Sequence, residues 1–210
     1  MKKIVGVDKN DISKIFYERT KIKSFPKEKL PSKNWPESWK RIFTKDYPRL
    51  QKVELLKNVP RLKTTLSEAL LQRKSERNFS EKPMDMPNLG TLLFYSAGII
   101  PGTKQWNMTR RFYPSAGARY PIEVYVSIKN VRGLENGLYH YNVRQHSLDV
   151  LWIQKDLNKK IAKLAAQDWI SKANVVVLLS AIFYRTQVKY SERGLRHIFL
   201  EAGHLGQNIY

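Results

Sequence analysis

The alternation of apolar and polar residues predicts the strands of a sheet. Over residues 122–126 every second residue is aliphatic, and this period of two is typical of a strand with one buried face. Residues 136–152 place apolar residues on both sides of a polar turn and therefore predict a hairpin. The run 173–183 is apolar almost throughout, which indicates a central strand covered on both faces.

Helical periodicity appears where apolar residues recur three and four positions apart, and Thr64 or Thr65 is suited to cap the first helix. The predicted helices span residues 66–73, 86–100, 156–170 and 191–210. Their predicted inward faces include Leu66, Ala69, Leu70, Leu89, Leu92, Leu93, Ile161, Leu164, Ala165, Trp169, Leu195, Ile198, Phe199, Ala202, Leu205 and Ile209. Residues 100–113 are expected to form a loop. The order of elements predicts an α+β fold around a small, mostly antiparallel sheet flanked by helices.

The first 62 residues differ in composition from the remainder, because they are rich in Lys, Pro and aromatic residues. Their prolines exclude a long helix, although a short helix near 37–44 fits the pattern. The aromatics are too many for a disordered arm. We therefore expect residues 1–62 to form an ordered extension that packs its rings on a main domain, residues 63–210. The rings are Phe16, Tyr17, Phe25, Trp35, Trp39, Phe43 and Tyr47.

The 210 residues include no Cys, which excludes a disulfide scaffold, a thiolate metal site and a cysteine nucleophile. The four His residues lack metal-ligand spacing, so no metal is expected. The net charge of +20 suits an anionic partner such as a phosphate cofactor or an acidic peptide, but equally a lysine-rich solvated surface. Because the charges are spread along the chain, nucleic-acid binding is not expected. We expect a cytoplasmic protein without a membrane span or signal peptide.

Three short segments contain residues suited to binding or catalysis. Arg73, Ser75 and Arg77 place two guanidinium groups and a hydroxyl where they can meet one anion, unless they form a solvated face. Residues 114–117 (Pro-Ser-Ala-Gly) leave backbone free to approach a flat ligand, unless they are an ordinary turn. Lys189 and Tyr190 are a pair that can exchange protons in a partly dry pocket, or a surface lysine beside a half-buried tyrosine.

Taken in order, these segments resemble the SagB-type dehydrogenases, a branch of the FMN-dependent nitroreductase family that oxidises azoline rings in ribosomally made peptides. The resemblance covers most of the chain. Its most specific parts are "YPSAGARYPIEVYV" and "GLYHYN", accompanied by "RKSERNF", "LLFYSAGI" and "KYSERGLRHIFLEAGHLGQNIY".

The resemblance implies a nitroreductase-type homodimer with FMN at the subunit interface. By matching motifs, the residues expected to hold the FMN phosphate and ribityl end are Arg73, Ser75 and Arg77, and those along the flavin ring are Pro114, Ser115, Ala116 and Gly117. Lys189 and Tyr190 match the lysine–tyrosine pair of the family, implicated in oxidising thiazoline or oxazoline to thiazole or oxazole. Which of the two removes the proton stays open.

Family members continue beyond the position that matches Tyr210, with a glycine-rich turn, a further strand and another basic contact to FMN. This sequence is therefore expected to be C-terminally short, with Leu205 and Ile209 in need of cover. Two alternatives follow: a flavin-free or truncated scaffold subunit of a peptide-modifying complex, and a general nitro- or flavin-reductase. A precursor peptide and cyclodehydratase-type proteins are the expected partners.

Overall fold

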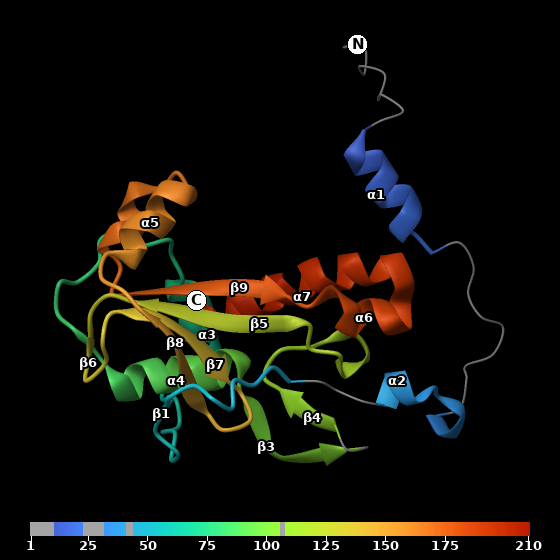
Figure 1. The fold of residues 1–210 in the computed structure, drawn as a ribbon, viewed down its shortest axis with the longest axis horizontal. Helices are drawn as coiled ribbons and strands as arrows, with labels where there is room; N and C mark the ends of the chain where they lie inside the picture. Colours follow the sequence, from blue (N-terminus) through green and yellow to red (C-terminus); the bar gives the residue numbers. More distant parts are fainter. Residues whose placement is uncertain (1–10, 23–31, 41–43, 106–107) are drawn as a thin grey trace.

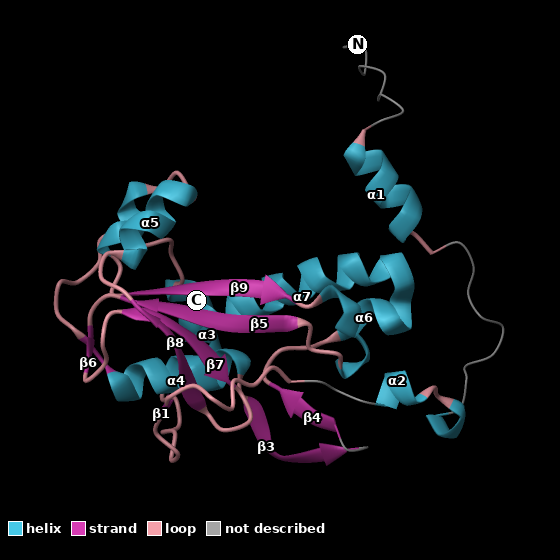
Figure 2. Ribbon diagram, in the orientation of Figure 1, coloured by secondary structure: helices cyan, strands magenta, loops and turns pink. Residues whose placement is uncertain are grey.

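The structure is a computed structural model that describes residues 11–22, 32–40, 44–105 and 108–210. Its centre is a five-stranded sheet in the order β1-β8-β7-β5-β9, in which every neighbouring pair is antiparallel (Figures 1 and 2). Helices flank this sheet, so the predicted α+β class with a mostly antiparallel sheet is confirmed.

The described residues form α-helices, β-strands and short 3-10 turns. The described α-helices are α1 (Ile12–Thr20), α2 (Glu37–Lys40), α3 (Leu66–Gln72), α4 (Met86–Ala97), α5 (Leu157–Leu164), α6 (Phe183–Tyr190) and α7 (Gly194–Ile209). The described strands are β1 (Lys52–Glu54), β2 (Met84–Asp85), β3 (Ile99–Gln105), β4 (Met108–Arg111), β5 (Ile122–Ile128), β6 (Val131–Arg132), β7 (Gly137–Asn142), β8 (Ser147–Ile153) and β9 (Val175–Ala181). Four short 3-10 turns are η1 (Ser32–Asn34), η2 (Ala116–Ala118), η3 (Asp168–Lys172) and η4 (Ser191–Arg193).

One face of the sheet builds the apolar core. The alternation predicted over 122–126 places Ile122, Val124 and Val126 on this face, where each is at most 3% exposed. Buried side chains of α4 and α7 belong to the same core. The longest described helix, α7, runs alongside β5 and β9 and ends at the C-terminus near the middle of the sheet (Figure 1).

The opposite face of the sheet buries a chain of charged side chains. His140 on β7 contacts Glu123 through Nε2 and Asp149 through Nδ1, each at 2.9 Å, and is fully buried. Glu123 in turn pairs with Arg185 of α6 at 2.5 Å, and Asp149 accepts from Lys52 of β1 at 2.9 Å. These pairs satisfy charges whose burial would otherwise be costly, and they tie α6 and the N-terminal extension to the sheet.

The extension packs on the remainder of the chain, as its composition predicts. Phe16 contacts Phe199 of α7 with ring centroids 6.1 Å apart, and Tyr47 contacts His140 at 5.2 Å. The extension also supplies β1, which pairs with β8 at the edge of the sheet, a strand that the sequence did not predict. The predicted short helix is found as α2, whereas Phe25 and Phe43 lie outside the described residues. The division of the chain at residue 62 stays a prediction.

Two strand predictions were wrong. The run 173–183 forms β9 at an edge of the sheet, and its side chains are only half-buried, because no described strand pairs with its outer side. The expected loop at 100–113 contains instead the antiparallel pair β3 and β4. Their residues are largely polar and include Gly and Pro, so the alternation that marks a core strand is missing.

The positions of the helices were predicted better than the side chains that they bury. Thr65 caps α3 with a capping box to Glu68, yet Leu66 and Leu70 on that helix are exposed. The helix predicted over 156–170 breaks where Ala166 adopts a φ of +52°, and Leu164, predicted to face inward, is 89% exposed.

On α7 the expected exposed pair is covered within the chain. Leu205 is fully buried, and Ile209 packs against the core. The apolar residues of this helix that remain exposed are Phe199, which was predicted to face inward, and Leu200. The exposed apolar surface of α7 is therefore at Phe199 and Leu200 and not at Leu205 and Ile209.

Candidate active site

The small turn at 114–117 meets the lysine–tyrosine pair. A Cβ placed on Gly117 would lie 2.8 Å from the Tyr190 hydroxyl and 3.2 Å from Lys189 Nζ. A side chain at this position would force the Tyr190 hydroxyl and the Lys189 amine to shift, and it would be strained at the φ of +60°, so both the contact and the backbone favour glycine here. The turn and the pair are more than seventy residues apart in sequence, and the fold brings them into contact because η2 packs against α6.

The backbone around this contact is strained. Ala118 and Tyr120 follow Gly117 with φ of +53° and +46°, and Ser191 follows Tyr190 with φ of +49° and ψ of −140°. Residues with side chains rarely adopt these conformations, which cost about 1–3 kcal/mol each and cluster at functional sites. The two strained segments flank the same place, which marks it as the candidate active site.

A buried acid lies behind the turn. Ser115 is half-buried, and its hydroxyl accepts a hydrogen bond from the Tyr120 backbone N–H at 2.8 Å. Glu201 of α7 is 2% exposed, and burial raises its pKa to about 7 against the opposing effects of the Ser115 hydroxyl and the Arg111 and Arg185 charges. Sequence reasoning missed Glu201, although a carboxylate among the apolar residues of α7 was a usable signal.

The electrostatics of the pair differ from expectation in one respect. Burial lowers the pKa of Lys189, and the nearby Arg119 charge lowers it further, as expected for a lysine in a partly dry pocket. Burial raises the pKa of Tyr190 and outweighs Arg119, which acts in the opposite direction. The neighbouring cation thus acts to make Tyr190 more acidic, but burial has the larger effect. Burial thus disfavours the ammonium form of Lys189 and the phenolate form of Tyr190.

The N-terminal extension forms one side of this site. Lys189 Nζ lies 4.0 Å from the centre of the Trp35 ring and 5.2 Å from that of Trp39. Arg119 is 2% exposed and donates from Nη1 to the Trp39 carbonyl at 2.5 Å and from Nη2 to the Ser38 carbonyl at 3.0 Å. Neither Arg119 nor the two tryptophans were predicted as site residues. The aromatic content of the extension was the available signal.

The arginine segment lies elsewhere in the chain. Arg73 follows α3, and Arg73, Ser75 and Arg77 are all exposed. Ser75 and Arg77 line a cavity of about 640 Å³ together with Trp169, residues 175–177 of β9 and the end of α7. The Arg77 guanidinium lies 5.6 Å from the centre of the Trp169 ring. Arg77 and the Ser75 hydroxyl line this largely apolar cavity together with Glu76, whereas Arg73 does not line it. A guanidinium and a hydroxyl beside an apolar cavity suit a ligand with a phosphate and a flat ring system.

The cavity that Ser75 and Arg77 line does not include the turn. Among the described residues, the 640 Å³ cavity is lined by none of Pro114 to Gly117, and Pro114 is exposed. The turn lies beside α6, whereas the cavity includes Tyr210 at the opposite end of α7 (Figure 1). Each half has chemistry that fits part of FMN: an open glycine turn for the ring, and guanidinium groups for the phosphate.

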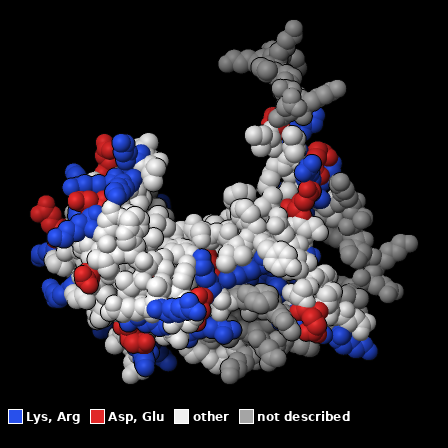
Figure 3. Space-filling model, in the orientation of Figure 1, with Lys and Arg blue, Asp and Glu red and all other residues white. Residues whose placement is uncertain are grey.

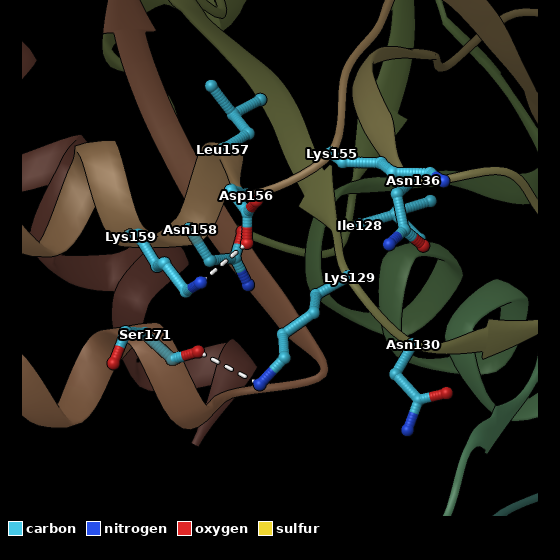
Figure 4. A pocket seen from close by; sticks show the side chains of 10 residues that line it. All are labelled: Ile128, Lys129, Asn130, Asn136, Lys155, Asp156, Leu157, Asn158, Lys159 and Ser171. Carbon is cyan, nitrogen blue, oxygen red and sulfur yellow. Dashed lines mark hydrogen bonds and ion pairs between the residues drawn. The ribbon is translucent and has the colours of Figure 1, made fainter.

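A second cavity, of about 280 Å³, lies at the α5 end of the sheet (Figure 4). Lys129, Lys155 and Lys159 line it, and sequence reasoning did not single out any of them. Lys129 donates to the Ser171 carbonyl at 3.0 Å, and Lys159 pairs with Asp156 at 2.8 Å. Lys and Arg also gather on the surface over α5 (Figure 3). This end of the molecule is basic but holds no candidate catalytic pair.

Comparison with known proteins gives the family. The model of the nitroreductase family matches residues 70–210. The chain belongs to the nitroreductase family. It is 34% identical over 146 residues to the nitroreductase-like protein MJ1384 of Methanocaldococcus jannaschii, which covers 69% of this chain and 71% of that protein. A solved structure of a nitroreductase-like protein from Anabaena variabilis superposes with a TM-score of 0.66 at 28% identity, over 94% of this chain.

A further relative is the trifolitoxin-processing protein TfxB of Rhizobium leguminosarum bv. trifolii, 34% identical over 104 residues. That match covers 47% of this nitroreductase-family chain and 28% of TfxB, and the chain spans 37% of the Anabaena protein. The match to TfxB points to the SagB-type branch that the sequence resembles. Among the described helices of the chain, none has both the length and the apolar character that a membrane span requires.

Proposed function

We propose that the chain is an FMN-dependent oxidoreductase that oxidises thiazoline or oxazoline rings to thiazole or oxazole in a ribosomally made peptide. The contact of Gly117 with Lys189 and Tyr190 carries this proposal, because it joins the turn expected beside the flavin ring to the pair expected beside the substrate. The likeness to a trifolitoxin-processing protein supports a peptide substrate. The precursor peptide and cyclodehydratase-type proteins are the partners that this reaction implies.

Each residue of the proposed site has a separate role in the dehydrogenation. Bound FMN supplies the acceptor for the hydride that leaves the azoline ring. Lys189, whose pKa is lowered by burial, takes the proton from the adjacent ring carbon. Tyr190, whose pKa is raised, keeps its proton and donates a hydrogen bond to the ring heteroatom. The substrate thus loses one proton and one hydride, and molecular oxygen accepts the two electrons in the end.

Purification and a visible spectrum test the cofactor, and an azoline peptide tests the reaction. We expect a yellow protein, or one that becomes yellow with FMN, and the loss of two hydrogen atoms per ring by mass spectrometry. A colourless protein that FMN does not reconstitute would overturn the proposal in favour of a flavin-free scaffold subunit. A flavoprotein that reduces nitro compounds but leaves azolines unchanged would favour a general reductase.

We propose further that the two halves of each FMN site come from two copies of the chain. The exposed segment Arg73–Arg77 and the buried contact of Gly117 lie at different places in one monomer, so a homodimer is needed to join them. Mixed dimers test this arrangement. Arg77→Gln and Lys189→Met are each expected to be impaired alone, and mixed dimers of the two are expected to regain activity, since one of their two sites is intact. No recovery in proven mixed dimers would assign both patches to the same subunit.

A further inference from the structure

The indole rings of the extension lie directly over the candidate catalytic amine. Trp35 is the nearer, with its ring centre 4.0 Å from Lys189 Nζ, and Trp39 is 5.2 Å away. The two rings meet edge to face, with centroids 6.2 Å apart. A cation at 4.0 Å from an indole centre is well inside the range of cation–π attraction, for which tryptophan is the strongest of the aromatic residues.

Independent contacts fix Trp39, against which the Trp35 ring packs. Trp39 Nε1 donates to the Val188 carbonyl of α6 at 3.1 Å, directly before Lys189. Arg119, two residues after Gly117, donates to the carbonyls of both Ser38 and Trp39 and, through Nε, to the Arg185 carbonyl at 2.8 Å. The turn, the extension and α6 are therefore joined around Lys189. Such cross-bracing indicates a built arrangement and not a chance approach of surface side chains.

The charged and titratable groups that face Lys189 act on it in opposite directions. Arg119, from the end of η2, disfavours the ammonium form. Tyr190 on α6 has its ring centre 5.8 Å from Lys189 Nζ, and His197 of α7 packs on that tyrosine with centroids 4.7 Å apart. Among the described residues no carboxylate forms an ion pair with Lys189. The indole faces are thus the main groups there that favour the charged amine.

We propose that Trp35, braced by Trp39 and Arg119, is a positioning residue of the active site that holds the Lys189 side chain beside Gly117 and stabilises the ammonium group that forms when Lys189 takes a proton. The chemical consequence rests on the proposed function, because it matters only where Lys189 takes a proton. The pairing itself does not depend on that function. The extension then serves catalysis through Lys189 and is not only a structural cover.

The protonation of Lys189 can be measured without any turnover. In the full chain, trace acetylation with acetic anhydride at a series of pH values, followed by peptide mass spectrometry, gives the titration midpoint of each lysine. Trp35→Leu keeps an apolar side chain but removes the ring, and it is expected to lower the midpoint of Lys189 by on the order of one pH unit. Trp35→Phe keeps a weaker aromatic face and is expected to lower it less.

Trp152→Leu is the matched control. The ring centre of Trp152 lies 5.9 Å from Lys160 Nζ, and Trp152 is exposed on β8, a strand that lies apart from α6 (Figure 1). Its replacement is expected to leave Lys189 unchanged. An unchanged or higher midpoint of Lys189 in Trp35→Leu, in a protein that unfolds as cooperatively as wild type, would overturn the inference. If Trp35→Leu does not fold, an unchanged titration midpoint of Lys189 in Trp35→Phe would overturn the inference instead.

Activity separates this inference from the proposed function. If Trp35→Leu lowers the titration midpoint of Lys189 and shifts the pH profile of azoline oxidation by the same amount, both the inference about Trp35 and the proposed role of Lys189 as base are supported. When the midpoint falls but the profile stays, Trp35 acts on Lys189 as inferred and the role of Lys189 as base fails. When Lys189→Met is inactive but Trp35→Leu leaves the midpoint in place, the function stands and the role of Trp35 is excluded.

Discussion

The turn cluster, which we define as Gly117, Lys189 and Tyr190, and the arginine segment 73–77 are embedded in the protein very differently. Both are short polar motifs that the sequence marks as candidates of similar strength. The structure packs the turn cluster against α6, strains its backbone and braces it with Arg119. It leaves the arginine segment exposed, with Lys74 and Glu76 in a surface ion pair at 3.2 Å. A site that is braced in the monomer should respond to mutation in rate, and also in stability where the strained backbone is changed, whereas an exposed segment should respond in ligand affinity alone.

The largest expected effect is that of Lys189→Met, which keeps the length of the side chain but removes the amine. We expect azoline oxidation to fall by about 10²–10⁴-fold, since this is the usual contribution of a positioned general base. The flavin spectrum and the thermal unfolding midpoint should remain close to wild type. Lys160→Met, which also removes a lysine that lies over a tryptophan ring, is the control and should keep full activity. Unchanged turnover in Lys189→Met would remove this residue from the mechanism.

Glu201 is expected to make stability depend on pH. Its pKa of about 7 in the folded chain exceeds the ordinary value of 4.5, so the folded state binds more protons than the unfolded state between these values. Stability therefore falls as the pH rises from 4.5 through 7, by up to about 3 kcal/mol for a shift of this size. Glu201→Gln should remove this dependence, which urea unfolding at pH 5 and pH 8 would measure. Exposed Glu81→Gln is the control; equal slopes in all three proteins would refute the burial argument.

Gly117→Ala tests whether the turn must touch the lysine–tyrosine pair. The added methyl group meets the Tyr190 hydroxyl and Lys189 Nζ, and a displacement of about 1 Å at such a site can lower the rate about 10²-fold. Gly133→Ala separates this effect from backbone strain, because Gly133 has a φ of +82° but nothing within 4 Å of the added atom. Both variants should lose about 1–2 kcal/mol of stability through their positive φ. Only Gly117→Ala should lose turnover, and equal turnover in the two would disconnect the turn from catalysis.

Local structure could be predicted from the sequence better than the burial of the resulting elements. The fold class, the hairpin at 136–152 and the cap at Thr65 follow from local patterns that tertiary contacts did not override. The edge position of β9 could not be predicted, since an apolar run fits a central strand and an exposed edge equally well. The direction of the Tyr190 pKa shift depends on whether the effect of burial exceeds that of the Arg119 charge. The sequence alone does not give the relative size of these two effects.

The same limit explains what was missed at the site. Trp35 and Arg119 act through contacts with α6 that are far away in sequence, so no spacing rule connects them to Lys189. Helix α6 itself was not predicted, because its residues Phe183 to Tyr190 are mostly aromatic or β-branched, or long and polar, without a clean apolar stripe. The residues that we propose to touch the ligand were predicted from motifs, but the residues that brace them could not be predicted in this way.

The smallest expected effect is that of Arg77→Gln, and it sharpens the contrast between the two regions. Because Arg77 is exposed, stability should change by no more than about 0.5 kcal/mol. The dissociation constant for FMN should rise about tenfold, since a charge-assisted hydrogen bond to phosphate is lost. Fluorescence titration with FMN measures the affinity. Lys74→Gln removes the same charge from the same exposed segment and is the matched control. If both variants weaken FMN binding equally, only the general positive charge acts there; if Arg77→Gln alone does so, its guanidinium contacts the phosphate directly.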